Sequence, residues 1–244
     1  MKVIILAAGR GSRLENYTKD LPKALVDING KSIIERQIDL FQKNNINKIF
    51  VVRGYMKEKF NMENIEFIDD DDYENHDQLG SLIAAQEQIS GEVIILFADL
   101  LFDENILHQI LDTNEDISLA LDLNWQQNHD EQRNNQFPAL AEIENNQIIR
   151  LSEKSNLNRK NFSGEFFGIL KLSSNGSEIL KKIIDKNKNS KNQFHDSLSF
   201  SAAKLPDIIQ EIIESDIIVK PIFIEGNWME IDTPEELEKA KTLF

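Results

Sequence analysis

The chain has 244 residues, of which 41% are hydrophobic and 28% charged, a composition typical of a soluble globular protein. Its formal net charge of −15 argues against nucleic-acid binding, which relies on clustered lysine and arginine, but a small nucleotide can still be held by local positive charge. There is no cysteine, so disulfides and thiolate metal sites are excluded. No apolar run approaches the ~20 residues of a membrane span, and Met1-Lys2 leads directly into an apolar segment. We therefore expect a cytoplasmic protein without a membrane partner.

Residues 3–6 form an apolar run that predicts a buried parallel strand, and a loop of small and basic residues follows it. Gly9 and Gly11 have no Cβ, so the backbone can turn sharply there and bring several N–H groups toward an anion. We interpret the segment as a phosphate-binding loop. The alternative is a tight turn from strand to helix with basic surface residues. The candidate residues are Ala8, Gly9, Gly11, Ser12, Arg13 and Lys23.

Two better-known glycine motifs do not fit this region. The dinucleotide-binding fingerprint needs a third glycine where Leu14 stands, and a P-loop ending at residues 30–32 needs an earlier glycine where Leu25 stands. Asn29-Gly30 is more simply a turn. Ser32 and Glu35 have the spacing of a capping box and predict that a helix begins here.

Apolar runs at residues 48–52, 65–68 and 91–97 predict further strands that alternate with helices. This alternation implies βαβ crossovers and a mostly parallel sheet, which binds ligands at the carboxyl ends of its strands. Asp99 follows the third run and therefore lies on the same edge as the glycine-containing loop. A single aspartate at such a position often caps a helix, but carboxylate oxygens are also the ligands that Mg²⁺ needs beside phosphates.

Four consecutive aspartates at residues 69–72 lack the ligand spacing and the central glycine of an EF-hand loop, so they predict a solvated loop. Gln78, Gly80 and Ser81 follow, ahead of an apolar helix predicted from Leu82. A glycine and a small hydroxyl at the start of a helix let a flat base approach the backbone and be read by hydrogen bonds. The alternative is an ordinary helix cap.

The second half of the chain departs from the βαβ order. After a predicted strand at 118–121 and a polar stretch at 124–137, two short runs around Asn145-Asn146 predict a β-hairpin. We therefore divide a single domain, residues 1–244, into a nucleotide-binding half at 1–121 and an acceptor-binding half at 122–244. Residues 177–216 predict two helices that contribute to the core.

Three side chains of the second half are candidates for binding the acceptor. Trp125 and Arg133 could hold a small zwitterionic or anionic group by cation–π contact and by bidentate pairing, although packing and surface roles are equally open. Glu165 lies in a predicted return strand at 164–170 and could pair with a cationic head group or with a neighbouring base.

Near the end of the chain, Glu230 and Asp232 alternate along an extended segment, so both project from one face and could bind one cation. Thr233-Pro234-Glu235-Glu236 then predicts a helix start, with Thr233 as the N-cap and Glu236 at the third helical position.

These motifs resemble those of a known family. Gly9-x-Gly11-x-Arg13-Leu14 with Pro22-Lys23-Ala24-Leu25 is similar to the signature loop of the nucleotidyltransferases that make NDP-sugars and CDP-alcohols, and Trp228-x-Glu230-x-Asp232-Thr233-Pro234 resembles their C-terminal metal motif. The resemblance implies an α/β nucleotidyltransferase fold with a mixed, mostly parallel, Rossmann-like sheet and an inserted β-hairpin at the acceptor. It also implies that Arg13 and Lys23 are catalytic, that Gly80-Ser81 contacts a pyrimidine and that Lys154 of Ser152-Glu153-Lys154 holds the acceptor phosphate. The implied Mg²⁺ ligands are Asp99, Glu230 and Asp232.

Segments 122–133, 164–168 and 228–234 look most like the cytidylyltransferases for 2-aminoethylphosphonate and phosphocholine. We therefore expect transfer of CMP from CTP to a small phosphonate or phospho-alcohol, such as 2-aminoethylphosphonate, a hydroxyalkylphosphonate or phosphocholine, with release of pyrophosphate. Two alternatives stay open: a sugar-1-phosphate nucleotidyltransferase that makes an NDP-sugar, and a non-catalytic nucleotide-binding domain. The sequence does not decide the oligomeric state, and a homo-oligomer is among the options.

Overall fold

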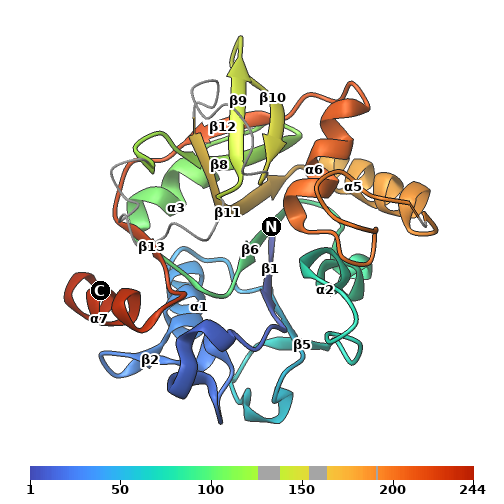
Figure 1. The fold of residues 1–244 in the computed structure, drawn as a ribbon. Helices are drawn as coiled ribbons and strands as arrows, with labels where there is room; N and C mark the ends of the chain where they lie inside the picture. The colour runs from blue at the N-terminus through green and yellow to red at the C-terminus, as the bar shows by residue number, and fades with distance from the viewer. Residues whose placement is uncertain (126–137, 154–163, 191) are drawn as a thin grey trace.

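A β-sheet runs through the middle of the computed structural model, which describes residues 1–125, 138–153, 164–190 and 192–244 (Figure 1). Within these residues the sheet has nine strands in the order β10-β9-β11-β6-β1-β4-β5, with β8 paired to β11 and β12 paired to β8. The strands are β1 (Lys2–Ala7), β4 (Ile49–Arg53), β5 (Glu66–Asp69), β6 (Val93–Phe97), β8 (Ile117–Asp122), β9 (Leu140–Glu144), β10 (Gln147–Ser152), β11 (Gly164–Leu172) and β12 (Lys220–Phe223).

Strands β5, β4, β1 and β6 pair in parallel, as the alternation of strands and helices predicts. The antiparallel pairs involve β11, which pairs with β6, β8 and β9, and the hairpin of β9 and β10. The predicted hairpin and the mixed sheet with a parallel centre are therefore confirmed. The division of the chain at residues 121 and 122 stays a prediction.

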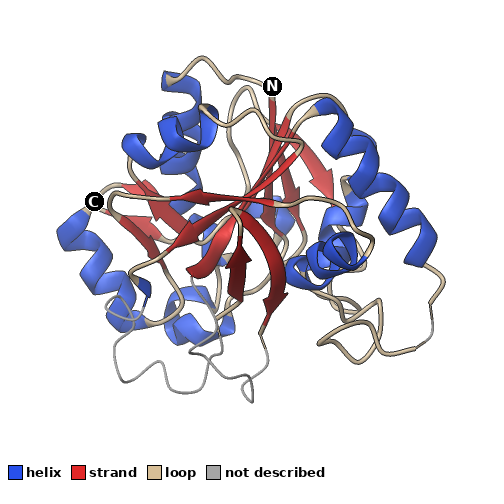
Figure 2. Cartoon of the chain, turned by 90° about the horizontal axis from the view of Figure 1, so that it is seen from above, coloured by secondary structure: helices blue, strands red, loops and turns tan. Residues whose placement is uncertain are grey.

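Helices cover both faces of the sheet (Figure 2). They are α1 (Ile33–Lys43), α2 (Gln78–Ala84), α3 (Glu104–Leu111), α5 (Ser174–Asn187), α6 (Leu205–Glu214) and α7 (Pro234–Leu243). Side chains of a strand alternate between its faces, so Val3 and Ile5 of β1 pack toward α1 and α3, whereas Ile4 and Leu6 pack toward α2, α5 and α6. None of the described helices has the length and apolar character that crossing a bilayer requires.

The helix starts follow the sequence signals closely, with one exception. Ser32 and Thr233 each accept a hydrogen bond from the third residue of their helix and complete the predicted capping boxes. Helix α2, however, begins at Gln78 with Asp77 as its N-cap, not at Leu82. The prediction was wrong because the Asp77 carboxylate, which accepts a hydrogen bond from the Gln78 backbone N–H, starts the helix one turn earlier.

Two short ribbons lie outside the main sheet. Strands β2 (Asp27–Ile28) and β3 (Lys31–Ser32) form a hairpin whose turn residues, Asn29 and Gly30, have φ of 54° and 88°, which confirms the predicted turn. Strands β7 (Leu100–Phe102) and β13 (Trp228–Glu230) pair antiparallel, and the backbone N–H of Ile231 donates to the carbonyl of Asp99 at 2.9 Å. The second ribbon fixes the C-terminal segment beside the turn after β6.

Candidate active site

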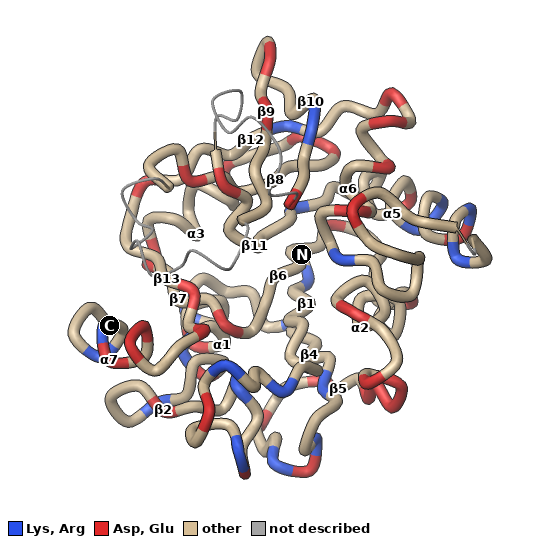
Figure 3. Tube along the Cα trace, in the orientation of Figure 1, with Lys and Arg blue, Asp and Glu red and all other residues tan. Residues whose placement is uncertain are grey.

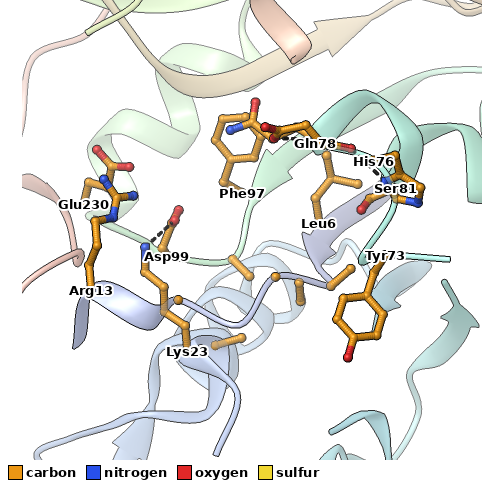
Figure 4. A pocket seen from close by; sticks show the side chains of 17 residues that line it. Leu6, Arg13, Lys23, Tyr73, His76, Gln78, Ser81, Phe97, Asp99 and Glu230 are labelled. Carbon is orange, nitrogen blue, oxygen red and sulfur yellow. Dashed lines mark hydrogen bonds and ion pairs between the residues drawn. The ribbon is translucent and has the colours of Figure 1, made fainter. Parts of the chain in front are cut away.

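A pocket of about 260 Å³ opens at the carboxyl ends of β1 and β6, the edge that the sequence pattern predicts (Figure 4). Its walls come from four parts of the chain: the loop after β1, the loop and first turn around α2, the turn after β6, and the end of β13. The lining residues are Leu6, Ala7, Ala8, Gly9, Gly11, Arg13, Lys23, Ala24, Tyr73, His76, Asp77, Gln78, Ser81, Phe97, Ala98, Asp99 and Glu230.

The loop after β1 holds Lys23 against the pocket. Gly11 has φ of 69°, a left-handed conformation that glycine adopts readily, and its carbonyl accepts a hydrogen bond from Thr18 Oγ1 at 2.9 Å. A Cβ at this position would lie 2.4 Å from the Cβ of Lys23, so only glycine allows the two segments to approach this closely. Leu14, which replaces the third glycine of a dinucleotide fingerprint, is fully buried and packs with Ile231 of the C-terminal segment.

Three carboxylates gather beside this loop. Asp99 follows β6, Glu230 ends β13 and Asp232 lies two residues further, and one oxygen from each lies within 4.8 Å of the others. Asp232 is only 2% exposed, and Asp99 Oδ1 is buried and has no hydrogen-bond partner within the described part of the chain. A set of three carboxylates, drawn together by the β7–β13 ribbon, is a donor set that suits a hard cation such as Mg²⁺.

Two basic side chains reach into this cluster (Figure 4). The ammonium of Lys23 donates to Asp99 Oδ2 at 2.7 Å and pairs with Asp232, while Nη2 of Arg13 lies 2.9 Å from Asp232 Oδ1. Burial of Lys23 by itself lowers its pKa, but the carboxylates of Asp99, Asp232 and Glu230 outweigh that effect and raise the pKa above the ordinary lysine value. Lys23 is therefore positively charged, and it neutralises part of the charge of the cluster.

The wider distribution of charge fits a local anion site. In Figure 3, several Lys and Arg positions gather in the part of the molecule that lies between the labels β2 and β5, below β1. Acidic positions are spread over most of the other elements. The overall charge of −15 therefore does not prevent a positive environment at the loop after β1.

At the opposite end of the pocket, the loop before α2 presents His76, and the first turn of α2 presents Gln78 and Ser81 (Figure 4). Ser12 and Gly80 are not among the lining residues: Ser12 begins the 3₁₀ segment Ser12–Thr18, and Gly80 faces the ring of His76. Their proposed contacts with a nucleotide stay predictions.

The acidic stretch before α2 differs from its prediction at one residue. Asp69, Asp71 and Asp72 are exposed as expected, but Asp70 is only 3% exposed. Its carboxylate accepts a hydrogen bond from Ser81 Oγ at 2.7 Å and lies 2.9 Å from His76 Nε2. The prediction of a solvated loop was wrong for Asp70 because these two partners compensate for its burial. The sequence does not distinguish Asp70 from its neighbours, because the strand predicted at 65–68 is followed directly by Asp69, which the structure includes in β5.

The candidate acceptor residues divide into two groups. Trp125 is buried against Leu140, and Glu165 is a buried residue of β11 in register with Asp122 of β8; neither lines the pocket. Arg133 and Lys154 lie outside the described residues. Asp122 was not among the predicted site residues; its carboxylate accepts a hydrogen bond from Trp228 Nε1 at 3.2 Å and so connects β8 to the ribbon of β7 and β13.

Known proteins resemble this chain in sequence and in fold. The profile of the MobA-like NTP transferase domain matches residues 3–131. The CTP:phosphoglutamine cytidylyltransferase of Campylobacter jejuni subsp. jejuni serotype O:2 is 28% identical over 254 residues, which cover 98% of the chain and 98% of that relative. The bifunctional protein GlmU of Methanococcus aeolicus is 27% identical over 247 residues; the alignment covers 99% of the chain but 54% of the relative, so the chain spans about half of its length.

Among solved structures, the CTP:phosphocholine cytidylyltransferase of Streptococcus pneumoniae has a TM-score of 0.72 at 22% identity, and the match covers 99% of the chain and 98% of that structure. This similarity is one of fold. The mixed α/β fold, with a pocket at the carboxyl ends of its parallel strands beside three carboxylates and the side chains of Lys23 and Arg13, agrees with the nucleotidyltransferases among these relatives. The chain belongs to the family of MobA-like NTP transferase domains, because more than half of it matches that family.

Proposed function

We propose that the protein is a Mg²⁺-dependent cytidylyltransferase, which transfers CMP from CTP to a small phosphonate or phospho-alcohol and releases pyrophosphate. The observation that carries the proposal is the cluster of Asp99, Glu230 and Asp232 with Lys23 and Arg13 at one end of the pocket. Phosphoryl-transfer sites need this combination of metal ligands and fixed positive charge.

In the proposed reaction an oxygen of the acceptor attacks the α-phosphorus of CTP in line, and pyrophosphate leaves without a covalent enzyme intermediate. Lys23, fixed in its place by Gly11, holds the α-phosphate and the acceptor, and Arg13 stabilises the leaving pyrophosphate. Asp99, Glu230 and Asp232 would hold Mg²⁺, which offsets the negative charge of the phosphates when it is bound. The loop containing Ala8, Gly9, Gly11 and Ser12 supplies backbone N–H groups to the triphosphate.

The choice of CTP draws on the names of the relatives. The full-length relative at 28% identity and the fold neighbour at TM-score 0.72 are both named as CTP-dependent, and their acceptors are phosphoglutamine and phosphocholine. Both acceptors are small phosphorylated compounds, which agrees with the acceptor class that the sequence motifs imply. We assign Trp125, Arg133, Lys154 and Glu165 to the acceptor as part of this proposal.

The test is release of pyrophosphate in the presence of Mg²⁺ with each of the four NTPs. The acceptor panel contains 2-aminoethylphosphonate, a hydroxyalkylphosphonate, phosphocholine, phosphoglutamine and glucose-1-phosphate. We expect release with CTP and one of the small acceptors that carry no sugar. Release with glucose-1-phosphate instead would establish a sugar-1-phosphate nucleotidyltransferase. Nucleotide binding without release under any combination would favour a non-catalytic domain.

A further inference from the structure

The end of the pocket next to α2 contains a buried hydrogen-bond network that has no role in the proposed binding of phosphates. Asp70 lies at the carboxyl end of β5, where its backbone N–H donates to the carbonyl of Arg53 at 2.9 Å. Its two carboxylate oxygens face different partners: Oδ2 accepts from Ser81 Oγ at 2.7 Å, and Oδ1 lies 2.9 Å from Nε2 of His76. His76 and Ser81 line the pocket on the side away from Lys23 and Asp99 (Figure 4).

This network fixes the direction in which the Ser81 hydroxyl points. A serine hydroxyl has a single hydrogen and two lone pairs, and the hydrogen of Ser81 is given to Asp70. Ser81 can therefore offer only a lone pair to a ligand in the pocket. A ligand N–H group next to the Ser81 hydroxyl would therefore gain a hydrogen bond. A ligand carbonyl oxygen there would face a lone pair of Ser81 and gain none.

The glycine before Ser81 makes the arrangement of the network possible. A Cβ on Gly80 would lie 2.1 Å from Cγ of the His76 ring, so the ring can lie against the helix and reach Asp70 only because residue 80 has no side chain. With His76 on one oxygen and Ser81 on the other, the Asp70 carboxylate cannot rotate without breaking a buried hydrogen bond.

Cytosine and uracil have the same size but differ at two adjacent ring positions: cytosine has an amino group at C4 and an unprotonated N3, whereas uracil has a carbonyl oxygen at C4 and an N–H at N3. We infer that Asp70 is a positioning residue for nucleotide selection: it turns the Ser81 hydroxyl into a pure acceptor, which favours the amino group of cytosine over the carbonyl of uracil. This inference rests on the proposed use of CTP, and it names residues that set the preference for CTP over UTP.

The experiment measures the dissociation constants of CTP and UTP by titration calorimetry in the presence of Mg²⁺, so no acceptor is needed. We expect the preference for CTP to fall by up to about tenfold in Ser81→Ala and in Asp70→Ala, the effect of one hydrogen bond. The double variant should show no further fall, because both substitutions remove the same interaction. Asp70→Asn should keep the preference, since its amide oxygen still accepts the Ser81 hydrogen while its amide N–H faces His76.

Asp71→Ala is the matched control, because Asp71 belongs to the same acidic stretch but is exposed and pairs with Lys57 at 2.5 Å. The control should bind both nucleotides as the wild type does. Equal weakening of CTP and UTP in Ser81→Ala would overturn the inference and leave a purely structural link between β5 and α2. Loss of the preference in Asp70→Asn would also overturn it, because charge and not the hydroxyl direction would then be responsible.

The pyrophosphate assay separates this inference from the proposed function. A wild-type protein that turns over CTP, combined with an unchanged preference in Ser81→Ala, overturns only the role of Asp70 and Ser81. A wild-type protein that turns over UTP in place of CTP overturns the proposed function itself.

Discussion

Replacement of Gly11 by alanine tests whether the loop after β1 determines the position of Lys23. With φ of 69°, Gly11 occupies a region that an alanine enters at a cost of about 1–2 kcal/mol. Its new Cβ would also lie 2.4 Å from Cβ and 2.7 Å from Cδ of Lys23. Because the Cβ of Lys23 is attached directly to the backbone, rotation of the side chain cannot relieve the contact. We therefore expect the ammonium to leave Asp99 and Asp232.

Gly30→Ala is the matched control. Gly30 has φ of 88°, but a Cβ added to it would meet nothing within 4 Å, and it belongs to the exposed turn between β2 and β3. The backbone strain of an alanine at this φ should lower the unfolding free energy of Gly30→Ala by about 1–2 kcal/mol. For a chain of this size, that corresponds to a decrease of roughly 2–8 °C in Tm. Gly11→Ala should lose a further 1–3 kcal/mol or so from overpacking.

Thermal denaturation and steady-state pyrophosphate release distinguish the two variants. Gly30→Ala should retain turnover within about twofold of the wild type at a temperature where it is folded, because its effect is confined to a remote turn. Gly11→Ala should lose about 10²–10³ in turnover, the usual effect of removing one preorganised electrostatic contact. If folded Gly11→Ala turned over as fast as Gly30→Ala, the reasoning that connects Gly11, Lys23 and the reaction would be refuted.

Three further predictions concern the carboxylates of the candidate metal site, the pH dependence of stability and the cap of α1. Asp99→Asn should weaken Mn²⁺ binding measured by electron paramagnetic resonance and lower turnover by at least about 10²; unchanged Mn²⁺ affinity would remove Asp99 from the metal site. Because the pKa of Lys23 is raised on folding, its stabilisation is complete below the ordinary lysine pKa of 10.5 and is lost as pH rises through the folded value. The difference in unfolding free energy between the wild type and Lys23→Met should therefore be constant from neutral pH to about 10 and shrink only above it; a decrease starting near neutral pH would contradict this sign. Ser32→Ala removes a capping box whose residues do not line the pocket, and it should lower the unfolding free energy by about 1 kcal/mol with unchanged turnover. Chemical denaturation measures this difference, and an unchanged unfolding free energy would show that the cap is unimportant.

Much of the fold follows from local sequence signals. Runs of apolar residues located the parallel strands, because a strand covered on both faces has few polar positions. Capping boxes located the starts of α1 and α7, since the side chain and backbone groups that form them are near neighbours in sequence. The β7–β13 ribbon had no such signal: each strand has three residues, and the pairing of Leu100 with Glu230 depends on contacts between distant parts of the chain.

The site was predictable where a residue follows a recognisable strand or belongs to a motif. The structure brings together five predicted site residues, the basic Arg13 and Lys23 and the acidic Asp99, Glu230 and Asp232. Their roles in the reaction stay predictions. The direct pairing of the basic and acidic groups was not predictable, because it depends on side-chain positions in three dimensions. Asp70 was missed because its neighbours in the run of four aspartates are exposed, and only its tertiary contacts with His76 and Ser81 distinguish it.

The ribbon of β7 and β13 also determines when the three carboxylates, Asp99, Glu230 and Asp232, can come together during synthesis of the chain. The loop after β1 and Asp99 are synthesised long before Glu230 and Asp232. The backbone N–H of Ile231 can donate to the carbonyl of Asp99 only after the C-terminal segment has folded back. A nascent chain that already contains the glycine loop therefore lacks two of its three clustered carboxylates. Under the proposed function, nucleotide turnover begins only after β13 has paired with β7, and activity therefore reports a chain in which this C-terminal segment has folded back.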